Sequence, residues 1–237
     1  MFTFDLYIYV RVGSSFQYKY FHTWTIEDDE LLPSGGDGVL DFVLGNCNYG
    51  ETDLLLPPYQ NLPNTASITI SYPGNPGYWN LHVNNMTPAG IYDLPVGPMT
   101  GWCGDQGTTI IPGTKNMYIY SSLYSTNWPA GMPFTQQDIA KVNWLFNNLG
   151  SFSGFYYLNG NTITSNDLSP EQGLVIQNAI WGIIHGTNGV SGMALDMASA
   201  ASNQGGFTPF PGGWAAILCV AFNKPVQHQL IFTVVDP

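Results

Sequence analysis

Two side chains in the sequence could form a covalent bond with each other. Cys103 stands in the segment 102–105 (WCGD), and Gln177 stands in the middle of an apolar stretch. A thiol and a carboxamide that are held in contact away from water can condense with loss of ammonia to an internal thioester, which is an acyl group that a nucleophile attacks. Cys103 is therefore a candidate sulfur donor and Gln177 a candidate acyl donor.

The element that must position Gln177 is a helix expected between Ser169 and Gly186. Ser169 suits the N-cap, Pro170 the first helical position, and Gln172 closes a capping box. An apolar face follows at helical spacing: Ile176, Ala179, Ile180, Ile183 and Ile184. Because a carboxamide buried beside such a face is costly without a partner, we expect Gln177 to be bonded to another group.

The two segments 102–105 (WCGD) and 177–181 (QNAIW) together resemble the bacterial thioester domains of surface adhesins and related secreted proteins. In that family an aromatic-Cys motif and a Gln-x-Ala-Ile-Trp motif supply the two halves of a Cys–Gln bond. The resemblance extends over about residues 68–235. One departure is Ile176, where family members often carry Thr before the glutamine, so that one possible hydrogen bond is lost.

The resemblance implies an extracellular surface protein that captures amines covalently, for adhesion or crosslinking. A lysine side chain on a host or neighbouring protein would attack the acyl carbon, leaving an amide and a free Cys103 thiol. Each bond reacts once, so the resemblance implies no enzymatic turnover, and it implies neither cofactor nor metal.

Four neighbouring residues are expected to support the bond. Trp102 and Trp181 would shield it from water, since hydrolysis competes with useful attack. Asp105 or His185 could assist removal of the thiol proton. Simpler alternatives remain open: a histidine at a helix C-terminus is satisfied by the helix dipole, and Cys103 and Gln177 could be a buried cysteine and a hydrogen-bonded glutamine without reaction.

The composition restricts the possible partners. The chain has 5 Lys or Arg residues against 16 Asp or Glu and a formal net charge of −11, which excludes the basic surface that nucleic acid needs. Charged residues make up only 9% of the chain, as is typical of extracellular β-rich proteins. We expect no membrane span, because no run of eighteen apolar residues occurs. The N-terminus does not resemble a signal peptide, so a leader would be removed or lie outside this sequence.

The other cysteines and one acidic run leave alternatives open. If Cys103 is in a thioester, Cys47 and Cys219 could form a disulfide, or both could be buried thiols. The four carboxylates of residues 27–30 (EDDE) could bind a hard cation such as calcium, but their spacing is not that of an EF-hand, and a solvated turn is the simpler interpretation.

Hydropathy patterns predict an α+β fold that is mainly β. Period-two alternation predicts strands at residues 2–12 and 65–72, and an aromatic-rich segment predicts one at 16–26. Segments beside turn residues predict strands at 78–83, 108–111 and 117–120, and apolar runs predict strands at 214–222 and 229–235. Helical patterns occur at 135–148 and 191–202 as well as in the central stretch. We expect a β-sandwich or barrel-like sheet body over residues 63–237, with a helical subdomain inserted at about 121–206. Cys103 then comes from the sheet and Gln177 from the helices, so the site lies at their junction.

Residues 1–62 are expected to form an N-terminal β-hairpin arm that packs on its own sheet or is donated to a neighbour's sheet. Donation of the strand at residues 2–12 would make the chain a subunit of an extracellular filament, with or without an intact thioester. A third hypothesis is a hydrolase in which His185 activates Cys103 and Asp105 or an asparagine orients the histidine.

Overall fold

The computed structural model describes residues 2–12, 15–26, 60–72, 77–158, 160–210, 212–222 and 228–235. The chain divides into two compact units, Met1–Leu55 and Leu56–Pro237. In the first unit, β1 (Phe2–Val12) and β2 (Ser15–Ile26) form an antiparallel hairpin. The acidic run 27–30 and Cys47 lie outside the described residues.

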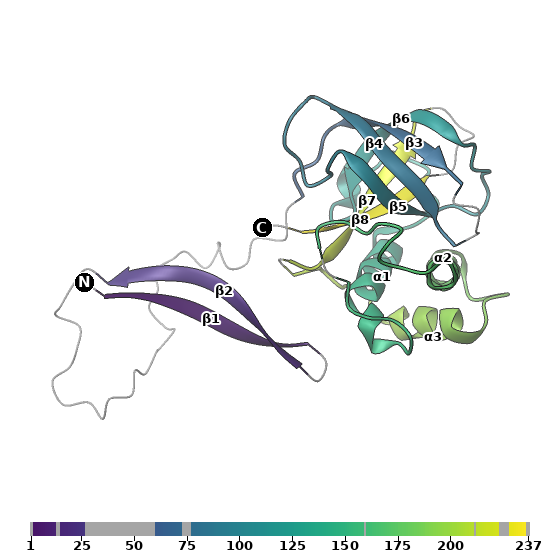
Figure 1. Ribbon diagram of the computed structural model, residues 1–237. Helices are drawn as coiled ribbons and strands as arrows, with labels where there is room; N and C mark the ends of the chain where they lie inside the picture. Colours follow the sequence, from purple (N-terminus) through teal and green to yellow (C-terminus); the bar gives the residue numbers. More distant parts are fainter. Residues whose placement is uncertain are drawn as a thin grey trace. The chain divides into compact units, whose positions relative to one another are not determined.

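The second unit is built on a closed barrel of six antiparallel strands (Figure 1). Its strands are β3 (Thr65–Ser71), β4 (Trp79–Thr87), β5 (Gly97–Cys103), β6 (Gly113–Ser121), β7 (Trp214–Ala221) and β8 (Gln229–Val234), in the order β3-β4-β5-β8-β7-β6. Every second residue of β3 faces the barrel interior, as period-two alternation predicts. The expected mainly β, α+β fold is confirmed, with a barrel as its sheet body.

The strand expected at residues 108–111 is wrong. This segment belongs to the connection between β5 and β6 and forms no strand. Two local features turn the chain away from the ladder. The Asp105 carboxylate accepts a hydrogen bond from the Gly107 backbone N–H at 2.7 Å, and Pro112 has no N–H to donate.

Three α-helices lie between β6 and β7 and gather on one side of the barrel (Figure 1). They are α1 (Gln136–Asn147), α2 (Pro170–His185) and α3 (Gly192–Ala201), with short 3₁₀ turns at Ser125–Asn127 and Leu149–Ser151. Helix α2 begins as its sequence predicts: Ser169 and Gln172 form the capping box, and Pro170 is the first helical residue. It ends at Gly186, whose φ of +93° is readily adopted by glycine.

Two apolar cores hold this unit together. One fills the barrel, and the other lies between the barrel wall and the helices. Trp102 belongs to the second core. It is completely buried and makes edge-on ring contacts with Phe146 of α1 and Phe232 of β8, at centroid distances of 5.0 and 5.7 Å. Trp102 therefore joins the helices to the barrel wall.

Helix α2 approaches the barrel closely because Gly173 has no side chain. A Cβ atom at Gly173 would overlap the ring of Tyr78, which is itself buried. One at Gly77 would overlap the backbone carbonyl oxygen of Pro170. The Trp102 indole N–H also donates to the carbonyl oxygen of Gly173 at 3.4 Å. These contacts hold α2 against the end of β5, where Cys103 lies.

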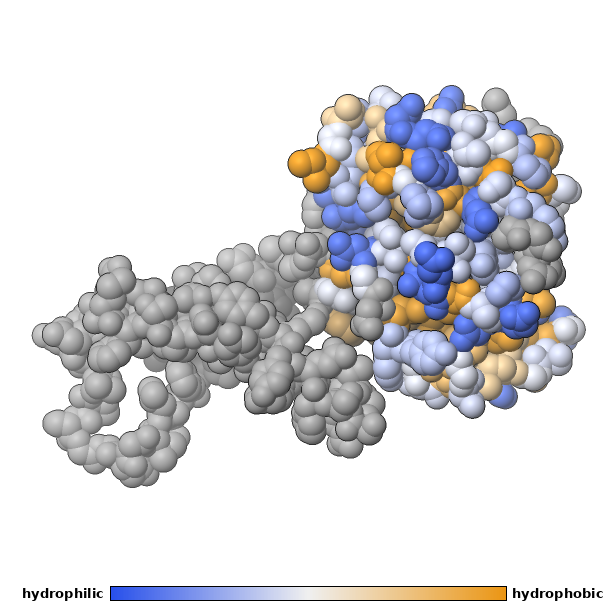
Figure 2. Space-filling view, viewed as in Figure 1, coloured by the Kyte–Doolittle hydropathy of each residue, from blue (hydrophilic) through white to orange (hydrophobic). Residues whose placement is uncertain are grey.

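On the face of the second unit seen in Figure 2, hydrophobic residues are interspersed with hydrophilic ones. Among the helices that the structure describes, none has the length and apolarity needed to cross a membrane.

Candidate functional site

Cys103 is the last residue of β5 and is 4% exposed. In the pairing of β5 with β8 it stands opposite Gln229, and in the pairing of β8 with β7 Gln229 stands opposite Cys219. Residues that stand opposite each other in a ladder project from the same face of the sheet. The three side chains therefore form one row across β5, β8 and β7, on the face that includes the interior residues Ile217 and Ile231.

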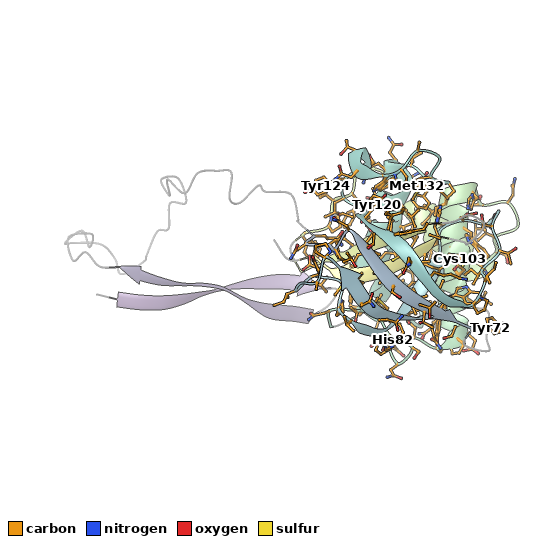
Figure 3. The ribbon with its side chains drawn as sticks, turned by 90° about the horizontal axis from the view of Figure 1, so that it is seen from above. Tyr72, His82, Cys103, Tyr120, Tyr124 and Met132 are labelled. Atoms are coloured by element: carbon orange, nitrogen blue, oxygen red, sulfur yellow. The ribbon has the colours of Figure 1, made fainter. Side chains whose placement is uncertain are left out.

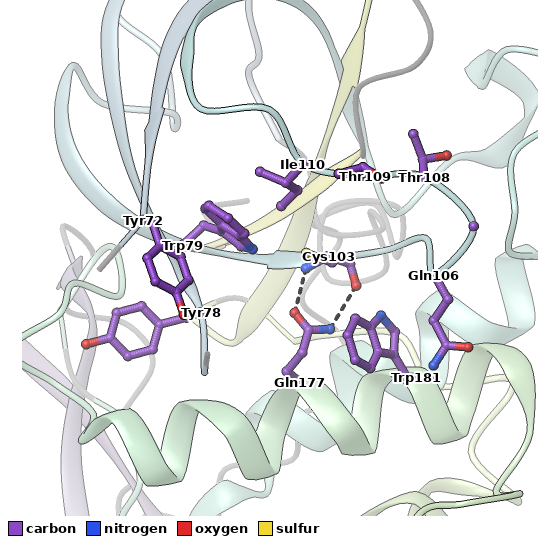
Figure 4. Close-up of a pocket in the computed structure, with 11 residues that line it drawn as sticks. Tyr72, Tyr78, Trp79, Cys103, Gln106, Thr108, Thr109, Ile110, Gln177 and Trp181 are labelled. Carbon is purple, nitrogen blue, oxygen red and sulfur yellow. Dashed lines mark hydrogen bonds between the residues drawn. The ribbon is translucent and has the colours of Figure 1, made fainter. Parts of the chain in front are cut away.

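Gln177 of α2 meets Cys103, as the sequence predicts, but it binds the backbone of that residue. Its Oε1 accepts a hydrogen bond from the Cys103 N–H at 2.7 Å, and its Nε2 donates to the Cys103 carbonyl oxygen at 3.0 Å (Figure 4). The side chain is 3% exposed. The expected cost of a buried amide is thus offset by two hydrogen bonds, and the Gln177 carboxamide fixes the end of β5 against α2.

A different glutamine lies beside the sulfur. The Nε2 atom of Gln229 is 3.9 Å from Cys103 Sγ, and it also donates to the carbonyl oxygen of His228 at 3.2 Å. Gln229 is completely buried. Gln229 was not predicted as a site residue, although a glutamine at the start of an apolar strand, 229–235 (QLIFTVV), is a signal of the same kind as Gln177 in its helix.

The surroundings of Cys103 favour the protonated thiol. Burial raises the pKa of Cys103 to about 12. Hydrogen bonds from the side chains of Gln229 and Trp79 lower the pKa in part, and the charge of Asp105 raises it further. The thiol therefore keeps its proton at neutral pH, unlike the thiolate that cysteine hydrolases use.

A cavity of about 510 Å³ gives access to Cys103. Its walls are aromatic on one side, with Tyr72, Tyr78 and Trp79, and are completed by Trp181 and the loop of residues 106–110 (Figure 4). Figure 3 shows Cys103 and Tyr72 toward the same side of the unit. Among the described residues that line the cavity, none carries a charge. A bound group would meet an aromatic and amide-bearing surface.

The expected supporting residues occupy different places. Trp181 lines the cavity, whereas Trp102 faces the core between barrel and helices. The carboxylate of Asp105 binds the Gly107 N–H and is not among the lining residues. His185 is exposed at the last position of α2 and is also outside the lining. In the described ranges no group of three or more metal-binding side chains occurs.

Cys219 is a free, completely buried thiol in the interior of the barrel, and burial raises its pKa. Of the two alternatives for this residue, the structure shows the buried thiol. Cys219 is not among the residues that line the cavity over Cys103. The two cysteines thus flank Gln229 from opposite sides, but only Cys103 meets the cavity.

No protein-family model matches the chain, and no curated protein does. The chain is similar to solved structures of thioester domains. The N-terminal thioester domain of fibronectin-binding protein SfbI from Streptococcus pyogenes is 14% identical, with a TM-score of 0.43 over 77% of this chain and 100% of that one. The N-terminal thioester domain of a Clostridium perfringens surface protein is 10% identical, with a TM-score of 0.42 over 70% and 97%.

The N-terminal domain of the Streptococcus pyogenes pilus tip adhesin Cpa is 15% identical, with a TM-score of 0.39 over 76% of this chain and 99% of that one. The chain is similar to these domains. The chemistry that its own site can perform depends on the residues around Cys103.

Proposed function

We propose that this chain captures amines covalently through an internal thioester between Cys103 and Gln229. The observation that carries the proposal is the contact of the Gln229 amide with the Cys103 sulfur, between residues that stand opposite each other on β8 and β5. In the condensation the sulfur bonds to the side-chain carbonyl carbon of Gln229. The carbon–nitrogen bond breaks, and the amide nitrogen leaves as ammonia with the thiol proton.

Gln229 is better placed than Gln177 to be the acyl donor. Both polar atoms of the Gln177 amide are bonded to the Cys103 backbone. Turning this amide toward the sulfur would leave two buried backbone groups without those bonds, at about 1–3 kcal/mol each. The Gln229 amide is already at the sulfur. Its departing nitrogen gives up a bond to the His228 carbonyl oxygen, but that oxygen also accepts a hydrogen bond from the Gly104 N–H. In this proposal Gln177 positions Cys103.

The cavity over Cys103 is the route by which an amine reaches the bond. A neutral amine attacks the carbonyl carbon, the carbon–sulfur bond breaks, and the amine loses a proton as Cys103 regains one. An amide of Gln229 and a free thiol remain. Since amines are stronger nucleophiles than hydroxyls, they react without the general base that the described cavity wall lacks.

The target in this proposal is a lysine side chain on a host or neighbouring protein, and the setting is the cell surface. A chain with 5 Lys or Arg residues offers few amines of its own that could use up the bond. Capture is stoichiometric, with one amine for each Gln229, and so the function is adhesion or crosslinking.

Intact-mass spectrometry of the whole chain tests the proposal. We expect a mass one ammonia below that of the sequence and one methylamine added on treatment with methylamine, with peptide mapping placing the adduct on Gln229. An adduct on Gln177 would overturn the assignment of the acyl donor but keep the thioester. A mass equal to that of the sequence, with no uptake of methylamine, would overturn the function.

A further inference from the structure

Trp79 and Cys103 lie on the same face of neighbouring strands. Trp79 is the first residue of β4 and stands opposite Gly101 of β5, and Cys103 follows Gly101 by two positions. Because side chains alternate along a strand, Cys103 shares the face of Gly101 and is the diagonal neighbour of Trp79. Gly101 itself has no side chain, and the Leu81 side chain and the Gln229 amide lie over it. Figure 4 shows the indole nitrogen of Trp79 directed toward Cys103.

We propose that the Trp79 indole N–H donates a hydrogen bond to the thioester sulfur and stabilises that sulfur when an amine displaces it. This inference rests on the proposed function. It makes Trp79 a catalytic residue of the capture step, because its N–H contacts a reacting atom.

The chemistry of bond formation leaves Trp79 as a donor to the sulfur. In the free thiol, the Gln229 Nε2 lies 3.9 Å from the Cys103 sulfur, and hydrogen bonding by the Trp79 side chain is among the influences that lower the pKa of Cys103. Condensation removes the Gln229 nitrogen as ammonia, and its carbonyl carbon becomes part of the thioester. The Trp79 N–H is not consumed. Of the two donors, Trp79 alone can therefore act on the sulfur during amine attack.

Departure of the sulfur needs such help because the site disfavours negative charge. Burial raises the pKa of the Cys103 thiol to about 12, even with both donors present. As the tetrahedral intermediate collapses, the electron pair of the carbon–sulfur bond passes to sulfur, which then takes up the proton lost by the attacking amine. A hydrogen bond strengthens as the charge on its acceptor grows, so the Trp79 donor acts most strongly at this stage.

The indole is held in place before reaction. Its ring contacts that of Tyr72 at a centroid distance of 5.4 Å and an interplanar angle of 54°. Trp79 is half-buried at the cavity wall, so water competes weakly for its N–H. A donor fixed in advance where charge develops does not have to reorganise during the reaction.

The test compares Trp79→Phe with Trp144→Phe, the same substitution at a partly buried position of α1 outside the cavity. The rate of methylamine uptake by the ammonia-deficient form is followed by intact mass. We expect Trp79→Phe to react about 10- to 100-fold more slowly and Trp144→Phe within about threefold of the unmodified chain, since tenfold corresponds to one ordinary charge-assisted hydrogen bond. An unchanged rate in Trp79→Phe would overturn the inference. Absence of the ammonia deficit in the parent chain would instead overturn the proposed function.

A second measurement does not depend on thioester formation. In a Gln229→Ala background, Trp79 remains the side-chain donor to the Cys103 thiol. We expect Trp79→Phe to slow iodoacetamide alkylation of Cys103 by about tenfold at a fixed pH between about 8 and 10, because less thiolate is present. Equal or faster alkylation, in variants whose circular dichroism matches the parent, would contradict the hydrogen bond to sulfur.

Discussion

Gln177 binds Cys103 through the backbone, with its Oε1 2.7 Å from the Cys103 nitrogen and its Nε2 3.0 Å from the Cys103 oxygen. The two bonds close a ring between α2 and the end of β5, and they leave the sulfur to Gln229. One glutamine thus holds the cysteine, and a second contacts its reactive atom.

Replacement of Gln177 should lower both the stability of the fold and the amount of thioester that forms. Gln177→Leu leaves the buried N–H and C=O of Cys103 without these partners, and we expect the free energy of unfolding to fall by about 2–5 kcal/mol. Urea unfolding measures the loss, and intact mass should show less of the ammonia-deficient form. Asn178→Ala, on the next helical position, is the control and should change stability by less than about 1 kcal/mol. A Gln177→Leu protein as stable as the control would contradict a stabilising role for the two hydrogen bonds of Gln177.

The two buried cysteines should behave differently although both flank Gln229. Cys103→Ala should abolish the ammonia deficit and the uptake of methylamine, because the sulfur at the cavity is gone. Cys219→Ala removes a thiol inside the barrel and should retain both properties. Intact mass with and without methylamine distinguishes the variants. An ammonia deficit that persists in Cys103→Ala and disappears in Cys219→Ala would show that Cys219, not Cys103, forms the thioester.

Alkylation of Cys103 should become faster with pH over an unusually high range. In the chain already reacted with methylamine, the thiol is free, and its raised pKa of about 12 keeps it protonated at neutral pH. We expect the iodoacetamide rate to rise about tenfold per pH unit from pH 8 to 10, since the thiolate fraction rises in that proportion below the pKa. Peptide mapping separates Cys103 from Cys219. A rate that levels off near pH 9 would indicate an ordinary, solvated thiol.

The same pKa predicts a change of stability at alkaline pH. In the unfolded chain a cysteine ionises near pH 8.5, whereas folded Cys103 keeps its proton until about pH 12. Its contribution to stability is therefore complete below pH 8.5 and is lost as the pH rises toward 12. Comparison of the free thiol form with Cys103→Ala by urea unfolding at pH 7 and pH 10 should show a steeper decline for the free thiol form. Equal declines in stability would contradict a raised pKa for Cys103.

A methyl group at Gly173 should separate α2 from the barrel. In Gly173→Ala the new Cβ meets the buried ring of Tyr78, so the helix must shift and draw Gln177 away from Cys103. We expect a loss of about 1–3 kcal/mol in stability and a smaller ammonia-deficient fraction, measured by urea unfolding and intact mass. Glu171→Ala, at an exposed position of the same helix, is the control. Equal results for both would show that the close approach is not needed.

Local signals were sufficient to predict the helix that carries Gln177. Its N-cap, its first-turn proline and its C-terminal glycine act within a few residues of one another, and the structure confirms all three. The meeting of Gln177 with Cys103 was also predicted, through the resemblance of two short motifs. The expected acyl role of Gln177 stays a prediction, and the contacts favour Gln229 for it.

The partner of the sulfur could not be predicted from local patterns. Gln229 lies 126 positions from Cys103 in the sequence, and only the pairing of β5 with β8 brings them together. Trp79 likewise reaches Cys103 by its position opposite Gly101, which depends on strand register. The segment 108–111 shows the opposite error: its β-branched residues predict a strand, but Asp105 and Pro112 turn the chain into the loop that borders the cavity.

The position of β8 between β5 and β7 has a mechanical consequence for capture. A target joined to Gln229 would be attached to a strand that is hydrogen-bonded along both edges, and a pulling force would load two ladders at once. The reaction also breaks the proposed thioester between Cys103 and Gln229, so the barrel would lose this internal crosslink when the target becomes bonded to Gln229. Resistance to traction would then depend on the non-covalent pairing of these three strands.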